Sequence, residues 1–286
     1  MHRVIGVVVK PGIAEALHAL ARLRALAPGT PFIIEGEGHH ALAPVPEGVE
    51  PVDAATFARE VDLVVVLGGD GTLIHAAHLL QERVVPILGV NMGRIGFLTE
   101  VRRDELAALF PHAVAGELPH SDRLRLKAEL WRERELVLSL SVLNDAVVAQ
   151  LALSRVATYR IHRGAELVTV VRGDGVIVST PTGSTAYSMA AGGSILEPSL
   201  EAWAVTPICP HALTQRPLVI NTDGEIKVTL ESDSTVYATL DGQVGKEFRR
   251  GDVLALTRSP VPTRLLSVPG RSHFETLRTK LRWGEA

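Results

Sequence analysis

Residues 61–72 read VDLVVVLGGDGT, an apolar run that ends in two glycines, an aspartate and a third glycine. The nearly continuous hydrocarbon of residues 61–67 is typical of a strand that is buried on both faces of a parallel sheet. In such a sheet, ligands bind beyond the carboxyl ends of the strands, where the chain turns into the next helix. Residues 68–72 occupy that position. The stretch therefore predicts an α/β domain with a ligand-binding turn directly after this strand.

The segments around this strand repeat an alternation of strand and helix. Residues 4–9 (VIGVVV) form another apolar run, and residues 13–26 carry apolar side chains at three- and four-residue spacing, as an amphipathic helix does. Further strands are expected at residues 32–34 and 84–90, and a loop is expected at residues 35–51. Helices are expected at residues 73–83 and 103–115. This alternation predicts a Rossmann-like parallel sheet covered by helices, in an N-terminal α/β domain over residues 1–120.

Beyond Pro119 the pattern changes to strict alternation of apolar and polar residues, clearest in residues 123–130 and 225–232. Alternation of period two is typical of half-buried antiparallel strands. Further short strands are expected at residues 135–142, 156–161, 167–171, 176–178, 235–240 and 252–257. The second domain is therefore predicted to be β-rich, sandwich-like, and to span residues 121–271.

The C-terminal segment, residues 272–286, is predicted to form a helix. Ser272 and Glu275 have the spacing of a capping box, and Phe274, Leu277 and Leu281 would share one apolar face. Because that face needs a partner, we expect the helix to pack back on the N-terminal domain.

The composition excludes several classes of protein. The 286 residues carry a formal net charge of -3, contain one cysteine, and include 46% hydrophobic residues. This charge gives no general attraction to nucleic acid or anionic membranes, and no apolar stretch approaches the ~20 residues of a membrane-spanning helix. We expect a soluble cytoplasmic protein without nucleic-acid or membrane partners.

The turn at residues 68–72 combines features that suit a phosphate ligand. Its glycines let backbone N–H groups approach a ligand, and the following helix N-terminus favours a phosphate. Asp70 adds a carboxylate that could hold a metal ion or accept a hydroxyl proton. Neither a Gly-Lys-Ser/Thr sequence nor a GxGxxG pattern is present, so a P-loop enzyme and a standard nicotinamide dehydrogenase are disfavoured.

A second candidate site lies at residues 173–193, GDGVIVSTPTGSTAYSMAAGG. Its hydroxyls can hydrogen-bond to a ligand, and Tyr187 offers an aromatic face to a planar ring. Asn144 and Asp145 interrupt an apolar strand and must be hydrogen-bonded, to the protein or to a ligand, if they are buried. His75 lies five residues after Asp70 and could point back toward the loop. No histidine pair or cysteine cluster has zinc-ligand spacing.

Taken together, these motifs resemble the bacterial NAD kinases. The resemblance rests on LGGDGT at 67–72, NMGRIGFLTE at 91–100, LNDAVV at 143–148, residues 173–193, PICPHALTQRPLVI at 207–220 and DGQ at 241–243. The motifs occur in the family's order and cover nearly the whole chain. GGDGT alone is less specific, because phosphofructokinases and lipid kinases carry similar loops.

The resemblance implies an NAD site between an α/β and a β-rich domain, and transfer of the γ-phosphoryl of ATP to the 2′-hydroxyl of NAD's adenosine ribose, giving NADP. It implies Asp70 as the base or orienting carboxylate and a divalent metal, expected to be Mg²⁺, that neutralises phosphate charge. Polyphosphate stays open as a further donor, and a homodimer or homotetramer is expected. No protein side chain is assigned as a metal ligand. The implied substrate contacts are Gly68, Gly69, Gly71, Thr72, His75, Asn144, Asp145, Arg155, Arg172, Asp174, Thr182, Thr185, Ala186, Tyr187, Ser188, Met189, Ala190 and Gln243.

Two alternatives remain at the level of sequence. One is a GGDGT kinase that acts on a lipid or a sugar phosphate, although a lipid kinase should present an apolar entrance in place of the hydroxyl-rich segment. The other is a dinucleotide sensor without catalysis, which would have no need of Asp70.

Overall fold

The computed structural model of the chain describes residues 4–10, 14–36, 45–93, 96–150 and 156–284. It divides into two compact units, one formed by Met1–Asp122 with Thr263–Ala286 and the other by Arg123–Pro262. The ligand-binding roles expected for the two domains stay predictions.

The first unit is built on a sheet whose strands run in the order β3-β2-β1-β4-β5-β20-β7, with β6 paired to β5. Its strands are β1 (Ile5–Val9), β2 (Phe32–Glu35), β3 (Val49–Val52), β4 (Leu63–Gly68), β5 (Ile87–Asn91), β6 (Val101–Arg102), β7 (His120–Arg123) and β20 (Thr263–Leu266). The pairings from β3 through β5 are all parallel. Every residue of β1, β4 and β5 is buried, as their apolar composition predicts.

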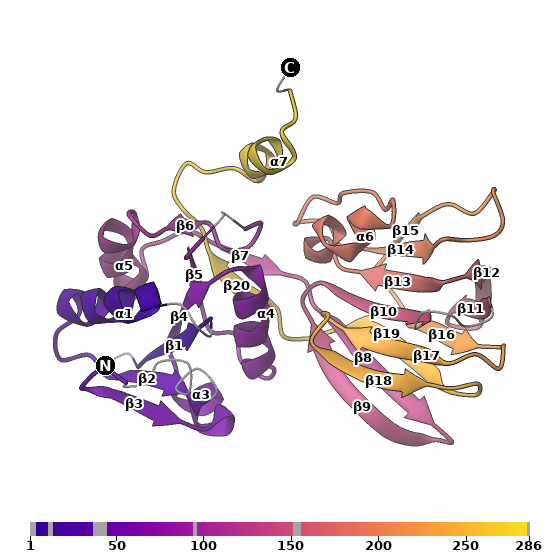
Figure 1. Cartoon of the computed structure of the whole chain (residues 1–286), viewed down its shortest axis with the longest axis horizontal. Helices are drawn as coiled ribbons and strands as arrows, with labels where there is room; N and C mark the ends of the chain where they lie inside the picture. The colour runs from indigo at the N-terminus through magenta and orange to yellow at the C-terminus, as the bar shows by residue number, and fades with distance from the viewer. Residues whose placement is uncertain (1–3, 11–13, 37–44, 94–95, 151–155, 285–286) are drawn as a thin grey trace. The chain divides into compact units, whose positions relative to one another are not determined.

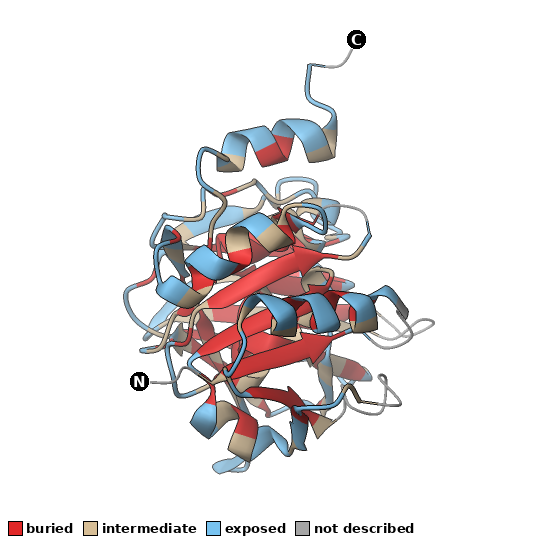
Figure 2. Ribbon diagram, turned by 90° about the vertical axis from the view of Figure 1, so that its left-hand side faces the viewer, coloured by how far each residue is buried: buried red, intermediate tan, exposed pale blue. Residues whose placement is uncertain are grey.

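Helices lie over this sheet, which Figure 2 shows in red beneath helices with pale-blue outer faces. They are α1 (Ala14–Leu26), α3 (Ala54–Glu60), α4 (Asp70–Leu79) and α5 (Leu106–Ala115). One core cluster joins Leu20 and Leu23 of α1, Phe110 of α5 and the inward side chains of the strands. The fold class predicted for this half, a Rossmann-like α/β sheet, is confirmed.

Several predicted boundaries in this unit are wrong: β5 and α5 begin three residues later than predicted, α4 ends four residues earlier, and two further differences have a physical reason or consequence. The expected loop over residues 35–51 contains most of β3, whose Val49 pairs with Phe32 of β2. The strand was hidden because Pro51 argues against a central strand, yet proline is tolerated in an edge strand such as β3. In addition, α4 begins at Asp70, three residues before the predicted start, so the aspartate belongs to the first helical turn.

The predicted C-terminal helix is present as α7 (His273–Leu281), and Ser272 caps it by accepting a hydrogen bond from the Glu275 amide at 3.1 Å. Within the first unit, Arg271 pairs with Glu105 at 2.8 Å, and the Lys280 ammonium lies 5.6 Å from the ring centre of Phe97. Of the predicted apolar face, Leu277 is buried and Leu281 is half-buried, whereas Phe274 is 60% exposed and was assigned to the face incorrectly.

The second unit consists of two six-stranded sheets, seen in Figure 1. The first contains β15 (Leu218–Asn221), β14 (Ala202–Ile208), β13 (Gly175–Ser179), β10 (Asp145–Gln150), β17 (Val236–Leu240) and β18 (Val244–Phe248), in that order. The second contains β12 (Glu166–Gly173), β11 (Ala157–Arg163), β16 (Ile226–Leu230), β19 (Val253–Arg258), β8 (Leu126–Arg132) and β9 (Glu135–Val142), in that order. One apolar cluster, with Trp203 and Tyr159 among its members, takes inward side chains from both sheets. The prediction of a β-rich, sandwich-like half is confirmed.

Asn144 and Asp145 do not interrupt a strand, as the sequence had suggested. The run SVLNDAVVA contains a strand junction, because β9 ends at Val142 and β10 begins at Asp145. None of the described helices has the length and apolar character that a membrane crossing requires.

Gly6 in β1 is a point where the packing of the first unit tolerates no side chain. A Cβ added there would lie 2.5 Å from Val61 Cγ1 and 2.6 Å from Phe57 Cζ. We therefore expect Gly6→Ala to destabilise the protein by ~1–3 kcal/mol, measured by urea unfolding. Gly245→Ala in β18 is the matched control, because a Cβ there meets no atom within 4 Å. Equal stability of the two variants would contradict this account of the packing.

Candidate functional site

Asp70 is held at the junction of β4 and α4 by a loop that lies later in the chain. Its Oδ1 accepts hydrogen bonds from the Leu98 amide at 3.1 Å, the Thr99 amide at 3.0 Å and the Thr99 hydroxyl at 3.1 Å. Its Oδ2 accepts one from the Phe97 amide at 2.7 Å. Four donors fix the orientation of the carboxylate. Since Oδ2 has only one of these donors, it retains capacity to accept a further hydrogen bond.

The glycines around Asp70 fall into two groups. A Cβ on Gly96 would lie 1.8 Å from Asp70 Oδ1, and one on Gly68 would lie 2.4 Å from Thr72 Oγ1, so packing within the protein excludes a side chain at both positions. A Cβ on Gly69 or Gly71 would meet no atom within 4 Å. The two residues that flank Asp70 in the chain therefore face open space at their Cβ positions.

Asn91 and Thr99 form a buried polar pair that supports the loop around Asp70. The Asn91 side-chain amide donates to Thr99 Oγ1 at 3.0 Å, and Asn91 Oδ1 accepts from the Gly93 amide at 2.7 Å. Asn91 and Thr99 are both buried. Sequence reasoning quoted their motif, NMGRIGFLTE, but did not assign these two residues, because only the fold brings Thr99 to Asp70.

His75 lies in α4 and faces the end of β2. Its Nε2 is 3.5 Å from Oε2 of Glu35, whose side chain is almost completely buried. A protonated His75 would therefore have a carboxylate partner in the protein. That His75 contacts a substrate stays a prediction.

The second unit contains a cavity of about 390 Å³ on the outer face of the sheet that includes β10 and β17. Ala186 and Tyr187 close one side of it, from the segment formed by the 3-10 turn η1 (Thr182–Thr185) and the short helix α6 (Tyr187–Ala190). The lining residues are Asn144, Asp145, Val147, Ala149, Gln150, Ala186, Tyr187, Tyr237, Thr239, Asp241 and Gly242. The cavity thus combines two tyrosines with two acidic side chains, a lining that suits a ligand with a planar ring and hydroxyl groups.

Asp145 is the most perturbed acid in this cavity. Burial raises the pKa of its carboxyl to about 7, and the nearby charge of Asp241 adds to the effect. Asp145 is 5% exposed. In the free protein at neutral pH, the side chain therefore exists in both protonation states and can donate or accept a hydrogen bond.

The hydroxyl-rich segment beside the cavity is partly structural. Thr180 Oγ1 donates to the Leu143 carbonyl at 2.6 Å, and the Ser188 and Thr206 hydroxyls lie 2.9 Å apart in the interior. A Cβ on Gly183 would lie 2.0 Å from the Asn144 carbonyl oxygen, so this glycine permits close contact between the segment and the Asn144 turn. Ser188, a predicted substrate contact, has its hydroxyl engaged within the protein.

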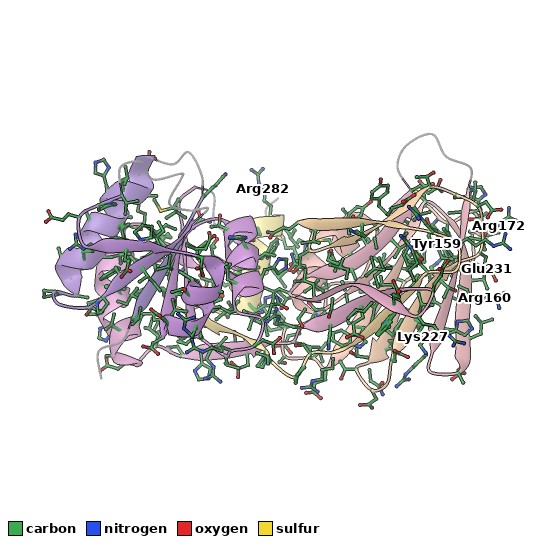
Figure 3. All side chains as sticks on the ribbon, turned by 90° about the horizontal axis from the view of Figure 1, so that it is seen from below. Tyr159, Arg160, Arg172, Lys227, Glu231 and Arg282 are labelled. Atoms are coloured by element: carbon green, nitrogen blue, oxygen red, sulfur yellow. The ribbon has the colours of Figure 1, made fainter. Side chains whose placement is uncertain are left out.

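Several predicted contacts do not line this cavity. Arg172 and Asp174 are exposed near the β12–β13 junction, and Figure 3 shows Arg172 at the end of the unit where Arg160 and Glu231 also lie. The other predicted contacts of the second unit outside the cavity are Thr182, Thr185, Ser188, Met189, Ala190 and Gln243. Arg155 lies outside the described residues.

Seven lining residues of the cavity were missed by sequence reasoning: Val147, Ala149, Gln150, Tyr237, Thr239, Asp241 and Gly242. For Tyr237 and Thr239 the signal was present, because alternation along β17 places them on the face opposite the core residues Val236, Ala238 and Leu240. Within the part of the chain that the structure describes, no group of three or more His, Cys, Asp or Glu side chains could hold a metal ion.

Comparison with known proteins identifies relatives of both units. Sequence models of the ATP-NAD kinase N-terminal and C-terminal domains match residues 47–118 and 143–268. A protein named NAD kinase from Citrifermentans bemidjiense is 48% identical over 238 residues, which cover 82% of this chain and 83% of that protein. The NAD kinase of Geobacter sulfurreducens is 46% identical over 240 residues, which cover 84% of each chain.

Two solved structures have a similar fold. Yeast NADH kinase complexed with NADH superimposes with a TM-score of 0.90 at 22% identity, over 99% of this chain and 88% of that one. An NAD kinase from Archaeoglobus fulgidus in complex with ATP superimposes with a TM-score of 0.73 at 25% identity, over 98% of each chain.

The raised pKa of Asp145 predicts how stability depends on pH. The folded protein holds this proton up to about pH 7, whereas the unfolded chain releases it near the ordinary value of 3.8. The free energy of unfolding therefore falls as the pH rises through this window, by up to roughly 4 kcal/mol. We expect Asp145→Asn to remove this loss, so that the variant is more stable than the parent at pH 8 but not at pH 4.

Thermal unfolding at the two pH values measures this effect. Asp223→Asn, at an exposed turn of the same unit, is the control and should change stability little at either pH. The prediction is contradicted if the difference in stability between Asp145→Asn and the parent protein is the same at pH 4 and at pH 8.

Proposed function

The chain belongs to the NAD kinase family, and on this basis we propose how its residues phosphorylate NAD. The chain is an enzyme, a phosphotransferase that moves the γ-phosphoryl group of ATP to the 2′-hydroxyl of NAD's adenosine ribose, and its product is NADP. The lipid-kinase, sugar-phosphate-kinase and sensor alternatives are not favoured by these relatives.

Asp70 is the proposed catalytic carboxylate. One observation carries this proposal: four hydrogen bonds fix the carboxylate, Oδ2 accepts only one of them, and the Cβ positions of the adjacent residues Gly69 and Gly71 face open space. Oδ2 would accept the hydrogen bond of the ribose 2′-hydroxyl and take its proton as the oxygen attacks the γ-phosphorus, while the bond from that phosphorus to the bridging oxygen breaks and ADP leaves. Because the loop holds the carboxylate in advance, little reorganisation is needed when the substrate arrives.

The cavity of the second unit is the proposed dinucleotide site. Tyr187 and Tyr237 offer aromatic faces to a planar ring, and Asn144 and Asp145 offer polar groups to ribose hydroxyls. Ala186 lines the same cavity. The remaining predicted contacts are proposed on the family resemblance alone, and they are Gly68, Gly69, Gly71, Thr72, His75, Arg155, Arg172, Asp174, Thr182, Thr185, Ser188, Met189, Ala190 and Gln243.

Magnesium is proposed to enter as the complex with ATP. Among the described residues no cluster of ligating side chains fits a resident metal, so the phosphates would supply most of its ligands. When bound, the ion neutralises charge on the transferring phosphoryl group. We also propose that the chain forms a homodimer or homotetramer, and polyphosphate stays open as a second donor.

Replacing Asp70 tests its catalytic role. General-base assistance is worth ~10²–10⁴ in rate, so Asp70→Asn should lower kcat at least ~100-fold while NAD still binds. NADP formation is measured by coupling to an NADP-specific dehydrogenase, and NAD binding by calorimetry.

Asp62→Asn is the matched control for that variant. Asp62 lies just before β4, is exposed, and accepts one backbone hydrogen bond, from the Val4 amide at 3.0 Å. Its loss should leave kcat close to that of the parent. Near-normal turnover of Asp70→Asn would remove Asp70 from the catalytic step.

Removing the metal separates a substrate-borne ion from a structural one. Excess EDTA should abolish NADP formation from ATP and NAD, whereas the thermal midpoint of the free protein should stay unchanged. Added Mg²⁺ should restore the activity. A fall of the midpoint in EDTA would instead reveal a metal that belongs to the fold.

A further inference from the structure

Asp241 closes the edge of the proposed dinucleotide site in an uncommon backbone conformation. It follows β17 with φ of +51°, and it is 7% exposed. Residues other than glycine rarely adopt positive φ, and aspartate is among those that tolerate it best. The side chain at this position therefore needs a reason beyond the turn itself.

The carboxylate of Asp241 gathers the backbone of another turn. Oδ2 accepts from the Leu143 amide at 2.8 Å, and Oδ1 accepts from the amides of Asn144 at 2.7 Å and Asp145 at 3.1 Å. The Asp241 amide donates in return to the Asp145 carbonyl at 2.9 Å. Three successive amides thus converge on one carboxylate, as backbone N–H groups do around a bound anion.

This arrangement is costly at its location. The charge of Asp241 lies close to the buried carboxyl of Asp145 and disfavours its ionisation. Both side chains line the cavity, together with Asn144 and Gly242. If the turn served stability alone, a second buried acid would not be needed to close it. The position of Asp241 therefore indicates a role at the cavity.

We propose that Asp241 is a positioning residue for dinucleotide binding, which holds the Leu143–Asp145 turn so that Asn144 and Asp145 face the cavity. The inference rests on the proposed role of Asn144 and Asp145 in binding NAD. Asp241 acts through these two residues, and the phosphoryl transfer step does not require it.

The substitution Asp241→Asn tests this proposal. An asparagine has a single acceptor oxygen, which can stay with Asn144 and Asp145. Its NH₂ group then faces the Leu143 amide, so two donors oppose each other. The loss of one buried hydrogen bond with a charged acceptor should raise the KM for NAD roughly tenfold. The KM for ATP, and kcat at saturating NAD, should stay within about twofold of the parent.

Asp252→Asn is the matched control, because Asp252 is also a buried aspartate of the same unit. It accepts from the Arg249 amide at 2.8 Å and from Arg132, and it does not line the cavity. This variant should lose thermal stability without a change in the KM for NAD. A purely structural role of Asp241 would make the two variants behave alike.

A second readout is the titration of Asp145, followed by carboxyl ¹³C NMR of the full chain. Because the charge of Asp241 helps to raise the pKa of Asp145, Asp241→Asn should lower it. Asp252→Asn should leave it unchanged.

The variant Asn144→Ala shows whether a negative result for Asp241→Asn contradicts only the positioning role of Asp241 or the proposed dinucleotide site as well. If Asn144→Ala raises the KM for NAD and Asp241→Asn does not, the inference is overturned and the site stands. If neither variant changes this KM, both are overturned. Should Asp241→Asn fail to fold, Asp241→Glu replaces it, since it keeps the charge and moves the carboxylate by one methylene; an unchanged KM for NAD in that variant also overturns the inference.

Discussion

The constraint on which both sites depend is a carboxylate that gathers backbone amides from a distant part of the chain. Asp70 holds Phe97, Leu98 and Thr99 in the first unit, and Asp241 holds the turn before β10 in the second. In each case the acceptor follows the end of a strand, and the donors lie in a loop or, for Asp145, at the first residue of the next strand. The loops near the proposed substrates are thus ordered by a few polar side chains, whereas the sheets are ordered by extended apolar cores.

This division has an energetic consequence. The cores supply stability through buried hydrocarbon, while the cavity of the second unit brings together acids that oppose folding when both are charged. Asp145 illustrates the conflict, because its burial near Asp241 raises its pKa to about 7. Functional sites commonly retain such unfavourable groups, and the surrounding structure compensates for them.

Sequence reasoning succeeded where the pattern is local. The apolar run before Gly68 predicted a buried parallel strand, and alternation beyond Pro119 predicted the antiparallel half. It failed where an element depends on its neighbours in the fold. The β3 strand was not predicted because it contains Pro51, and the turn at Asn144 was not predicted because it contains neither glycine nor proline. The role proposed for Asp241 could not be predicted, because spacing along the chain does not reveal which amides, almost a hundred residues away, converge on one carboxylate.

The two groups of glycines around the candidate site would respond differently to selection. Gly68, Gly96 and Gly183 are required by atoms of the protein itself, because an added Cβ would strike neighbouring atoms in the folded chain. Gly69 and Gly71 meet no such obstacle. A library of variants selected only for folding would preserve the first group and let the second diversify. Any restriction that remained at Gly69 and Gly71 under selection for growth would therefore come from contact with the substrate.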